Sequence, residues 1–161
     1  MNNRQKTIAK QITFEGIGLH SGVNCNVTLK PARENTGIIF SKYVNGQHYT
    51  IPGDFKYITQ SNLCTTIESD DSKIKIFTIE HLLAAIKGND IDNIEILVDQ
   101  QEIPALDGSA LEFDKIIKKA KVVLQNEYKK YLSIKKHISV KKNKSSIDIY
   151  PSDKLVIDCI I

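Results

Sequence analysis

The sequence predicts an α+β protein, in which a sheet packs against two helices and a second domain of similar style follows the first. Short stretches with two-residue alternation of apolar residues, typical of half-buried strands, occupy most of residues 7–77. Helical composition then follows at 79–87 and at 110–120, with a strand at 93–99 between them. Strands followed by a strand between two helices indicate helices on one face of a sheet.

The early strands are each bounded by turn residues. Ile8, Ile12 and Phe14 fall on one face of a predicted strand at 7–14. The acidic segment at 69–72 is of the kind that makes the turn of a strand pair. The further strands that we expect lie at 24–30, at 36–42, around Ile51, at 61–68 and at 73–77.

Both helices have recognisable ends in the sequence. Thr78 is a suitable N-cap for the first helix, because its hydroxyl can accept a hydrogen bond from the first turn. Lys87 suits the last turn of this helix, and Gly88 suits its C-cap. The turn at 107–109 (Asp-Gly-Ser) leads into the second helix, whose entry it can cap.

The polar segment at 121–130 reads as a linker, after which strand patterns start again. We therefore expect a first α+β domain at 1–125 and the opening strands of a second, incomplete α+β domain at 126–161. A segment as short as the second cannot bury a self-sufficient core, so we expect the chain to be truncated. The strands expected in the second domain are 131–134, 138–140, 146–150 and 155–161.

Composition favours a soluble globular protein, with 41% apolar and 25% charged residues. No apolar run approaches the roughly 20 residues of a membrane helix, and the polar start at 1–10 lacks the apolar core of a secretory signal. We therefore expect a cytoplasmic protein without stable membrane insertion. Three scattered cysteines without a CxxC pair argue against a disulfide framework, and we expect Cys25 and Cys159 to be small buried residues.

Charge is unevenly distributed along the chain. Residues 115–144 carry eleven lysines against one acidic residue, whereas residues 1–114 have a balance of −5. Such a basic block can attract phosphates or nucleic acid. The chain has only two arginines and no tryptophan, however, and base-specific recognition favours arginine forks and stacking aromatics. We therefore expect a solvated lysine-rich face and no nucleic-acid partner, with a nucleic-acid-binding α+β module as the alternative.

Glu80 and His81, at the start of the first predicted helix, are the pair that most suggests chemistry. Adjacent helix positions point about 100° apart, so these side chains can line two sides of one pocket at a helix mouth. The N-terminus of the helix favours the ionised carboxylate. The pair is also compatible with ordinary structure, because an acid in the first turn commonly caps a helix and a single histidine is more often structural than a ligand.

Two other segments could approach a ligand. The loop at 16–22 has three glycines and His20, so its backbone could approach a ligand closely, although a tight strand connection with His20 on its surface is the simpler explanation. The segment at 63–66 is either a half-buried strand or the lining of a pocket. Cys64 has no adjacent histidine or basic residue to activate its thiol, so we do not expect a nucleophile there.

Seven short segments occur together in one order. They are GIGLHSG (16–22), LKPA (29–32), TGIIF (36–40), LCTT (63–66), TIEHLLAA (78–85), IDN (91–93) and EIPALDGSA (102–110). In sequence and order they resemble the UDP-3-O-acyl-N-acetylglucosamine deacetylase family, and YPSDKL (150–155) continues the resemblance. No single segment is specific, but chance does not explain seven in collinear order.

The resemblance implies a two-domain α+β hydrolase with zinc and substrate between its domains. Its reaction removes the acetyl group of a UDP-linked, 3-O-acylated N-acetylglucosamine, a small-molecule lipid precursor, in the committed step of lipid A biosynthesis. Carried over by position, His81 is implied as a Zn²⁺ ligand and Glu80 as the general base. The positions implied to lie near the substrate are Leu19, His20, Leu63 and Cys64.

The resemblance also implies that the remaining zinc ligands and the general acid belong to a carboxy-terminal half that this sequence lacks. A catalytic zinc site usually has three protein ligands. We therefore expect the chain alone to bind zinc weakly and to have no meaningful deacetylase activity. The alternative within this family is a non-catalytic remnant that folds without holding zinc.

Overall fold

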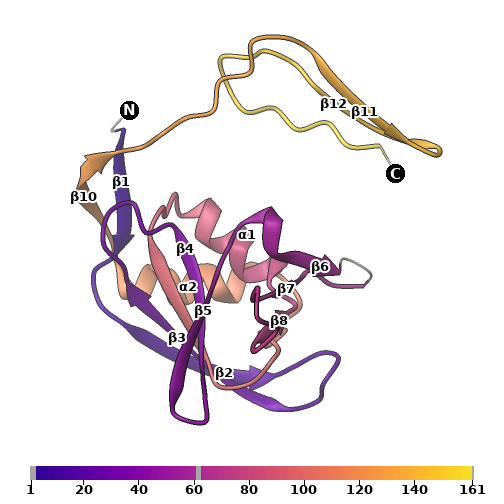
Figure 1. Cartoon of the computed structure of the whole chain (residues 1–161). Coiled ribbons are helices and arrows are strands. Elements are labelled where there is room, and N and C mark those ends of the chain that lie inside the picture. The colour runs from indigo at the N-terminus through magenta and orange to yellow at the C-terminus, as the bar shows by residue number, and fades with distance from the viewer. Residues whose placement is uncertain (1–2, 61–62, 161) are drawn as a thin grey trace. The chain divides into compact units, whose positions relative to one another are not determined.

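The computed structural model describes residues 3–60 and 63–160 of the chain (Figure 1). The chain divides into two compact units, Met1–Lys129 and Lys130–Ile161. Among the described residues, the first unit contains two α-helices, one short 3₁₀ helix and three sheets, and the second contains a two-stranded hairpin.

A five-stranded sheet forms the centre of the first unit. All neighbouring strands are antiparallel except β4 (Ile38–Val44) and β9 (Ile94–Val98), which run parallel and are joined by a long crossover. The strands predicted at 24–30, 36–42 and 93–99 are confirmed within two residues at each end, and the strand around Ile51 is β5. The order across the sheet is β2 (Ile12–Ile17), β3 (Asn24–Pro31), β9 (Ile94–Val98), β4 (Ile38–Val44) and β5 (Gln47–Pro52).

Two helices, α1 (Glu80–Gly88) and α2 (Leu111–Ala120), lie against one face of this sheet (Figure 1). Every second residue of β9 is buried, which directs one face of the strand toward the helices. The predicted α+β architecture and both predicted helices are therefore confirmed. The core shared by sheet and helices includes Val27, Leu29, Phe40, Ile94, Ile96, Leu82, Ile86, Phe113 and Ile117.

The C-terminal end of α1 differs by one residue from the prediction. Gly88 belongs to the helix, and Asn89 caps it by donating its backbone N–H to the carbonyl of Ala85 at 3.0 Å. The Asn89 side-chain amide donates to the same carbonyl at 2.9 Å. No helix in the described part of the chain is long and apolar enough to cross a bilayer.

A two-stranded ribbon corrects two predictions. The single strand expected at 7–14 is divided, because the chain leaves the first strand at Ile8 and turns before it enters β2. The linker expected at 121–130 is largely a strand, with Val122 opposite Ile8. Its strand character is hidden in the sequence because most of its side chains are exposed and its partner is at the other end of the first unit. The ribbon pairs β1 (Arg4–Ile8) antiparallel with β10 (Val122–Tyr128) (Figure 1).

A buried amide network fastens this ribbon to the sheet. Asn93 is only 1% exposed, and its side-chain oxygen accepts the backbone N–H of Gly37 at 2.8 Å. Its side-chain NH₂ donates to Gln5 of β1 and to Gln125 of β10, both at 2.8 Å. One amide thus satisfies donors and acceptors from both strands of the ribbon and from the turn before β4, as burial of a polar group requires.

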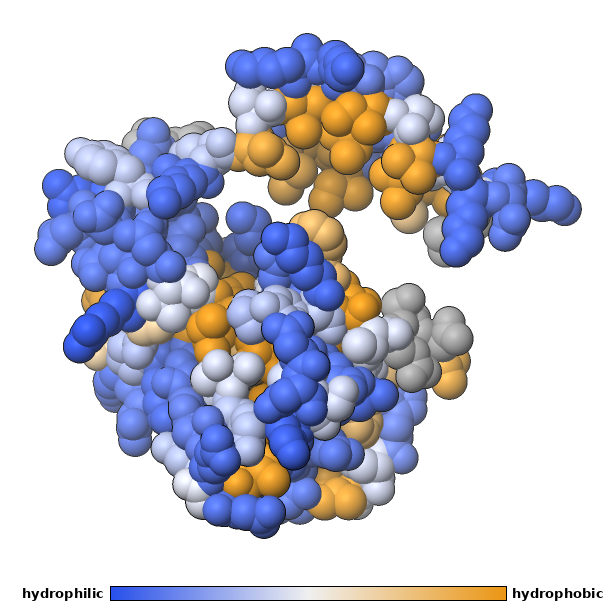
Figure 2. Space-filling model, viewed as in Figure 1, coloured by the Kyte–Doolittle hydropathy of each residue, from blue (hydrophilic) through white to orange (hydrophobic). Residues whose placement is uncertain are grey.

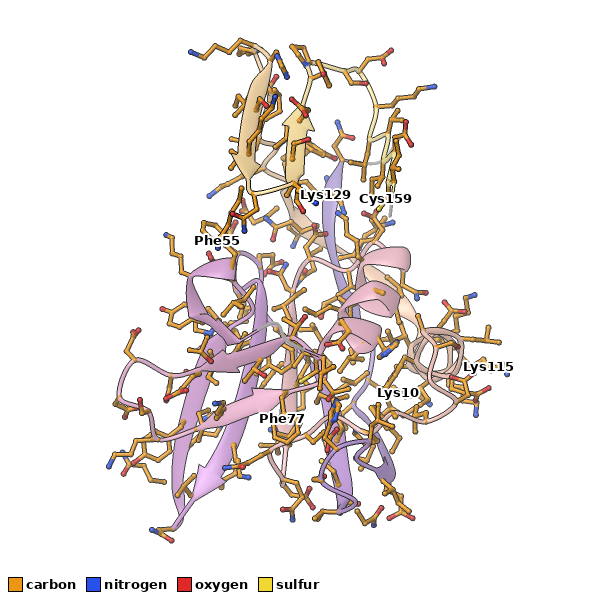
Figure 3. All side chains as sticks on the ribbon, turned by 90° about the vertical axis from the view of Figure 1, so that its right-hand side faces the viewer. Lys10, Phe55, Phe77, Lys115, Lys129 and Cys159 are labelled. Carbon is orange, nitrogen blue, oxygen red and sulfur yellow. The ribbon has the colours of Figure 1, made fainter. Side chains whose placement is uncertain are left out.

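The lysine block is only partly the solvated face that we expected. Lys115 and Lys118 of α2 are exposed and pair with acids of the same helix, and Lys115 lies at the periphery of the unit (Figure 3). Lys129 is different, because its side chain is only 9% exposed and its ammonium lies 2.7 Å from Asp90 and 2.9 Å from Asp92. Burial by itself would lower the pKa of Lys129, but these two carboxylates outweigh it and raise the pKa. Lys129 therefore links the end of β10 to Asp90 and Asp92, which follow α1.

A small three-stranded sheet precedes α1. The strand pair expected at 61–68 and 73–77 is present but shorter than predicted, with strands only at 66–68 and 75–77, and residues 61 and 62 lie outside the described residues. The acidic turn closes with the N–H of Ser72 donating to the carbonyl of Ser69 at 2.8 Å. The elements are the short 3₁₀ helix η1 (Phe55–Tyr57), β6 (Ile58–Gln60), β7 (Thr66–Glu68) and β8 (Lys75–Phe77).

The second unit has fewer strands than the sequence predicts. The expected strands at 138–140 and 146–150 form an antiparallel hairpin, but 131–134 and the described residues of 155–161 are not strands. Nothing in the described chain pairs with those two segments, and apolar sequence alone does not make a strand. Cys159 is exposed, contrary to expectation, whereas Cys25 is buried as expected. The hairpin consists of β11 (Ile138–Lys142) and β12 (Ser145–Ile149).

Every residue of this hairpin is exposed, the apolar ones included. Figure 2 shows the apolar surface of the second unit, which contrasts with the largely polar surface of the first in the same view. Within the unit, His137 stacks on Tyr150 with ring centroids 4.4 Å apart, and its Nε2 lies 2.9 Å from a carboxylate oxygen of Asp148. A hairpin without a buried face depends on such local contacts.

We predict that Asn93→Ala lowers the free energy of unfolding of the chain by about 2–3 kcal/mol, because it removes hydrogen bonds from buried Gln5 and from half-buried Gly37 and Gln125. Asn126→Ala is the matched control, since Asn126 is an exposed residue of β10, and we expect a change within about 0.5 kcal/mol. Urea unfolding followed by circular dichroism measures both. Equal loss in the two variants would contradict the structural role of Asn93.

Candidate active site

The helix that carries Glu80 and His81 begins abruptly after a strand. Thr78, expected as its N-cap, is buried and has a positive φ of 61°, and Ile79 takes the cap position without a side-chain hydrogen bond. The Thr78 hydroxyl instead donates to Glu102 at 3.0 Å. The prediction of Thr78 as N-cap is therefore wrong, because the helix begins one residue later than a Thr78 cap requires and the Thr78 hydroxyl bonds Glu102, outside the helix.

Glu80 is the first residue of α1 and is half-buried. Its Oε2 accepts the backbone N–H of Thr65 at 3.0 Å, which ties the 63–66 segment to the start of the helix. Its other oxygen accepts no hydrogen bond from the residues that the structure describes. The N-terminal end of the helix dipole stabilises a negative charge at this position.

His81 is also half-buried, one position further along the helix and about 100° around its axis. Within residues 3–60 and 63–160, no hydrogen bond or ion pair engages its imidazole. A neutral imidazole without a protein partner can act as a ligand for a metal ion. The same described residues contain no group of three histidine, cysteine or acidic side chains that could hold a metal ion.

The 63–66 segment is irregular and enters a strand only at its last residue. Leu63 has a positive φ of 67°, and its side chain is 91% exposed. Cys64 is half-buried, with its sulfur 3.8 Å from the hydroxyl of Thr66. Strand β7 begins only at Thr66, so Leu63 and Cys64 form an irregular edge next to Thr65 and the Glu80 carboxylate.

The loop at 16–22 is the tight connection between β2 and β3. The N–H of Gly18 donates to Val23 at 2.9 Å, and the N–H of Gly22, at a φ of 64°, donates to Gly18 at 3.0 Å. The side chains of Leu19 and His20 project from this turn, Leu19 being 68% exposed. The turn therefore presents one apolar side chain and one imidazole to solvent.

Glu102 joins this turn to the entrance of α1. It is only 1% exposed, and its carboxylate accepts hydrogen bonds from three residues. The donors are the backbone N–H groups of His20 and Ser21, at 3.0 and 2.8 Å, and the hydroxyl of Thr78 at 3.0 Å. Burial by itself would raise the pKa of Glu102, but the hydrogen bonds from Ser21, His20 and Thr78 outweigh it and hold the pKa below its usual value.

Sequence reasoning assigned no role to Glu102. The residue falls within a family segment, yet nothing nearby in the sequence marks it as buried and charged. Its partners are 82, 81 and 24 residues away, so only the folded chain brings them to it. A charged residue without visible local partners gives no sequence pattern that would have identified this role.

The structure thus brings the sequence-predicted residues together in two groups at the start of α1. Leu63 and Cys64 reach it through the hydrogen bond from Thr65 to Glu80. Leu19 and His20 reach it through Glu102 and Thr78. Chemically, the arrangement offers a carboxylate that can take a proton and an imidazole that can bind a metal ion, flanked by exposed apolar side chains.

We predict that the stability advantage of the parent chain over Glu102→Gln depends on pH. A carboxyl group whose pKa is lowered in the folded state contributes stability above its ordinary pKa of 4.5, and this contribution disappears as the pH falls through the folded value. The difference in free energy of unfolding should be constant between about pH 5.5 and 7 and shrink toward pH 3. Urea titrations at several pH values measure it, and a difference that persists unchanged at pH 3 would refute the assignment.

Comparison with known proteins gives these observations a family context. The model of the UDP-3-O-acyl N-acetylglycosamine deacetylase family matches residues 5–161. The UDP-3-O-acyl-N-acetylglucosamine deacetylase of Hydrogenovibrio crunogenus is 40% identical over 146 residues, which cover 89% of this chain and 48% of that protein. The protein of the same name from Legionella pneumophila (strain Corby) is 41% identical over 148 residues, covering 92% and 48%.

The chain therefore spans about half the length of the curated relatives that it matches. The family match, in contrast, extends over nearly the whole chain and includes the turn at 16–22, the 63–66 segment and the start of α1. On this evidence the chain belongs to the UDP-3-O-acyl N-acetylglycosamine deacetylase family.

Proposed function

We propose that this chain supplies one part of the active site of a zinc-dependent amide hydrolase. The proposed reaction removes the acetyl group of UDP-3-O-(3-hydroxyacyl)-N-acetylglucosamine as acetate, the committed step of lipid A biosynthesis, in the cytoplasm. The observation that carries the proposal is the Glu80 carboxylate at the first position of α1, anchored by Thr65 and followed directly by His81. Family membership supports the choice of reaction.

Glu80 is proposed as the general base. Hydrolysis of the acetamide consumes one water, whose oxygen joins the acetyl carbon while the amine leaves with a proton. A carboxylate must take the proton of that water as the bond forms. The hydrogen bond from Thr65 holds Oε2 in place, which leaves Oε1 to accept the proton.

His81 is proposed as one zinc ligand. When bound, zinc polarises the amide carbonyl and lowers the pKa of the attacking water. The half-buried imidazole has no hydrogen-bond partner among the described residues, which fits a ligand role, but a catalytic site needs about three protein ligands. No such group occurs in the described residues, so we propose that the other ligands come from outside them.

Leu19, His20, Leu63 and Cys64 are proposed to line the substrate side of the site. Exposed apolar side chains beside a reactive carboxylate are suited to an acyl chain, since its burial removes apolar surface from water. Leu19 and Leu63 are the two that the structure leaves 68% and 91% exposed. His20 offers an imidazole beside them, for a polar group of the same substrate.

The nucleic-acid alternative has less support from the lysine block. Lys115 and Lys118 are already paired with acids of α2, and the half-buried Lys129 is paired with Asp90 and Asp92. Ammonium groups that are neutralised in this way attract phosphates less strongly. We therefore propose a small-molecule UDP-sugar lipid precursor as the ligand.

We predict that the 161-residue chain alone binds zinc weakly, because His81 is the single proposed ligand and one imidazole cannot fix a tetrahedral geometry. Metal analysis after dialysis should find far less than one zinc per chain, and His81→Ala should change this little. Deacetylation of the UDP-sugar by the same preparation should be at background. One tightly held zinc per chain with normal turnover would show that the proposed ligand set is wrong.

We also predict opposite phenotypes for the two residues when the rest of the site is present. A chimera that joins this chain to the remaining half of the Legionella relative provides such a protein. In it, His81→Ala should lose zinc, whereas Glu80→Ala should keep zinc and lower kcat about 10²- to 10⁴-fold. Glu68→Ala is the control, since Glu68 is an acid of β7 that pairs with Lys75.

Zinc content and deacetylation rate are measured on the same samples of the chimera. If Glu80→Ala retained the parent rate, the general-base role would be wrong. If His81→Ala retained the parent zinc content, the ligand role would be wrong.

A further inference from the structure

We propose that Glu102 is a positioning residue of this site. Its buried carboxylate holds the turn that presents Leu19 and His20 against the junction that leads into Glu80 and His81. The role in catalysis rests on the proposed function, whereas the placement of the turn does not.

The contacts of Glu102 are concentrated on these two segments. Its carboxylate receives two successive backbone N–H groups from the turn, at His20 and Ser21, and one hydroxyl from Thr78. Hydrogen bonds to an ionised acceptor are about twice as strong as neutral ones. Because Glu102 is only 1% exposed, water cannot readily replace these donors, and a carboxylate that lost them would remain buried without hydrogen bonds. The carboxylate therefore holds both segments strongly.

The backbone places Glu102 rigidly beside the end of β8. The N–H of Phe77 donates to the carbonyl of Gln101 at 2.9 Å, and the N–H of Ile103 donates to the carbonyl of Phe77 at 3.0 Å. These two bonds flank Glu102 and form a parallel bridge between Glu102 and Phe77. Phe77 is labelled in Figure 3. The next residue, Thr78, turns the chain into α1. The backbone of Glu102 is thus fixed relative to the start of the helix by bonds that do not involve the turn.

The turn fits against this carboxylate without spare room. A Cβ on Gly18 would overlap a carboxylate oxygen of Glu102 and the hydroxyl oxygen of Ser21. Glycine is therefore required at position 18 by close approach of its backbone to a charged group. Any side chain there must displace either the turn or the carboxylate.

The side chains and the backbone of the turn have different environments. The backbone N–H of His20 is tied to a buried charge, while its side chain is exposed and that of Leu19 is 68% exposed. An anchored backbone with outward-facing side chains sets where those side chains stand relative to α1. Loss of the anchor should therefore move Leu19 and His20 without disturbing the core.

The test uses the 161-residue chain and NMR relaxation of its backbone amides. In the parent, we expect order parameters of about 0.85 at His20 and Ser21, and in Glu102→Gln we expect values below about 0.6. Amide protons that are hydrogen-bonded to a carboxylate resonate downfield. In Glu102→Gln, the amide proton resonances of His20 and Ser21 should therefore move upfield. Amides of the core, such as Val27, should be unchanged.

Asp99→Asn is the matched control. Asp99 also accepts a backbone N–H and a side-chain donor, both from Asn26 at 2.8 Å, but it contacts neither the turn nor Thr78. We expect no change at His20 and Ser21 in this variant. If Glu102→Gln does not fold, Thr78→Val removes one of the three donors and should give a smaller loss of order at the turn.

Gly18→Ala provides an independent route to the same state. This variant keeps the Glu102 side chain but forces its carboxylate and the turn apart. It should therefore reproduce the loss of order at His20 and Ser21. Because both substitutions act on one contact, the double variant should be no more disordered than either single variant. Additive effects would contradict the proposal, and so would unchanged order in Glu102→Gln or equal loss of order throughout the chain.

The chimera described above separates this proposal from the proposed function. There we expect Glu102→Gln to retain zinc and to lower kcat/KM at least tenfold, with Glu102→Asp recovering part of the rate. A normal rate in Glu102→Gln would overturn the positioning role in catalysis. A parent chimera without deacetylation would overturn the proposed function, while the order parameters of the 161-residue chain would still decide whether Glu102 holds the turn.

Discussion

A single buried carboxylate links the parts of this protein from which a site can be built. Glu102 accepts hydrogen bonds from the turn at 16–22 and from Thr78, and its own backbone bridges to β8. An ionised group in a protein interior is tolerated only when its hydrogen bonds are satisfied. The positions of the turn, the end of β8 and the start of α1 are therefore mutually dependent. The location of Glu80 and His81 follows from this constraint as much as from the helix itself.

A second polar constraint acts at the other end of β9, the strand that Asn93 precedes and Glu102 follows. Asn93 connects the β1–β10 ribbon to the turn before β4, and Lys129 connects the same ribbon to the acids that follow α1. Asn93 and Lys129 each bond to elements that are far from them in the sequence. Apolar contacts tolerate small shifts between layers, whereas satisfied buried amides and ion pairs specify one arrangement. These groups consequently select how the ribbon sits on the sheet.

The environment of Glu80 bears on how an acid in the first turn of a helix should be interpreted. In ordinary capping, such an acid reaches back to backbone donors of its own helix terminus. Here the carboxylate reaches instead to Thr65, on a segment outside the helix, and Ile79 occupies the cap position without a side-chain hydrogen bond. Capping therefore does not account for Glu80. A structural link to the 63–66 segment and a role in proton transfer are compatible, because each uses a different oxygen of the carboxylate.

Local patterns in the sequence were sufficient for much of the fold and for the residues of the candidate site. Local patterns identified the strands at 24–30 and 93–99 and the helix at 79–87. The buried face of each of these elements is formed by residues close together in the sequence, so its periodicity is visible there. Collinear motifs identified the family and, with it, Glu80 and His81. The sequence could not identify β10, the buried setting of Lys129 or the role of Glu102, because each depends on a partner brought near only by folding.

The sequence by itself thus determined the strands at 24–30 and 93–99 and both helices, and it nominated Glu80 and His81 as candidates for chemistry. Tertiary structure alone decided that Thr78 binds Glu102 instead of capping α1, and that the turn bearing His20 is anchored to the same group. Secondary structure follows from side-chain periodicity, which is local. The hydrogen bonds of a buried charge depend on which donors, distant in the sequence, the fold brings close to it. A local sequence pattern contains no information about that proximity.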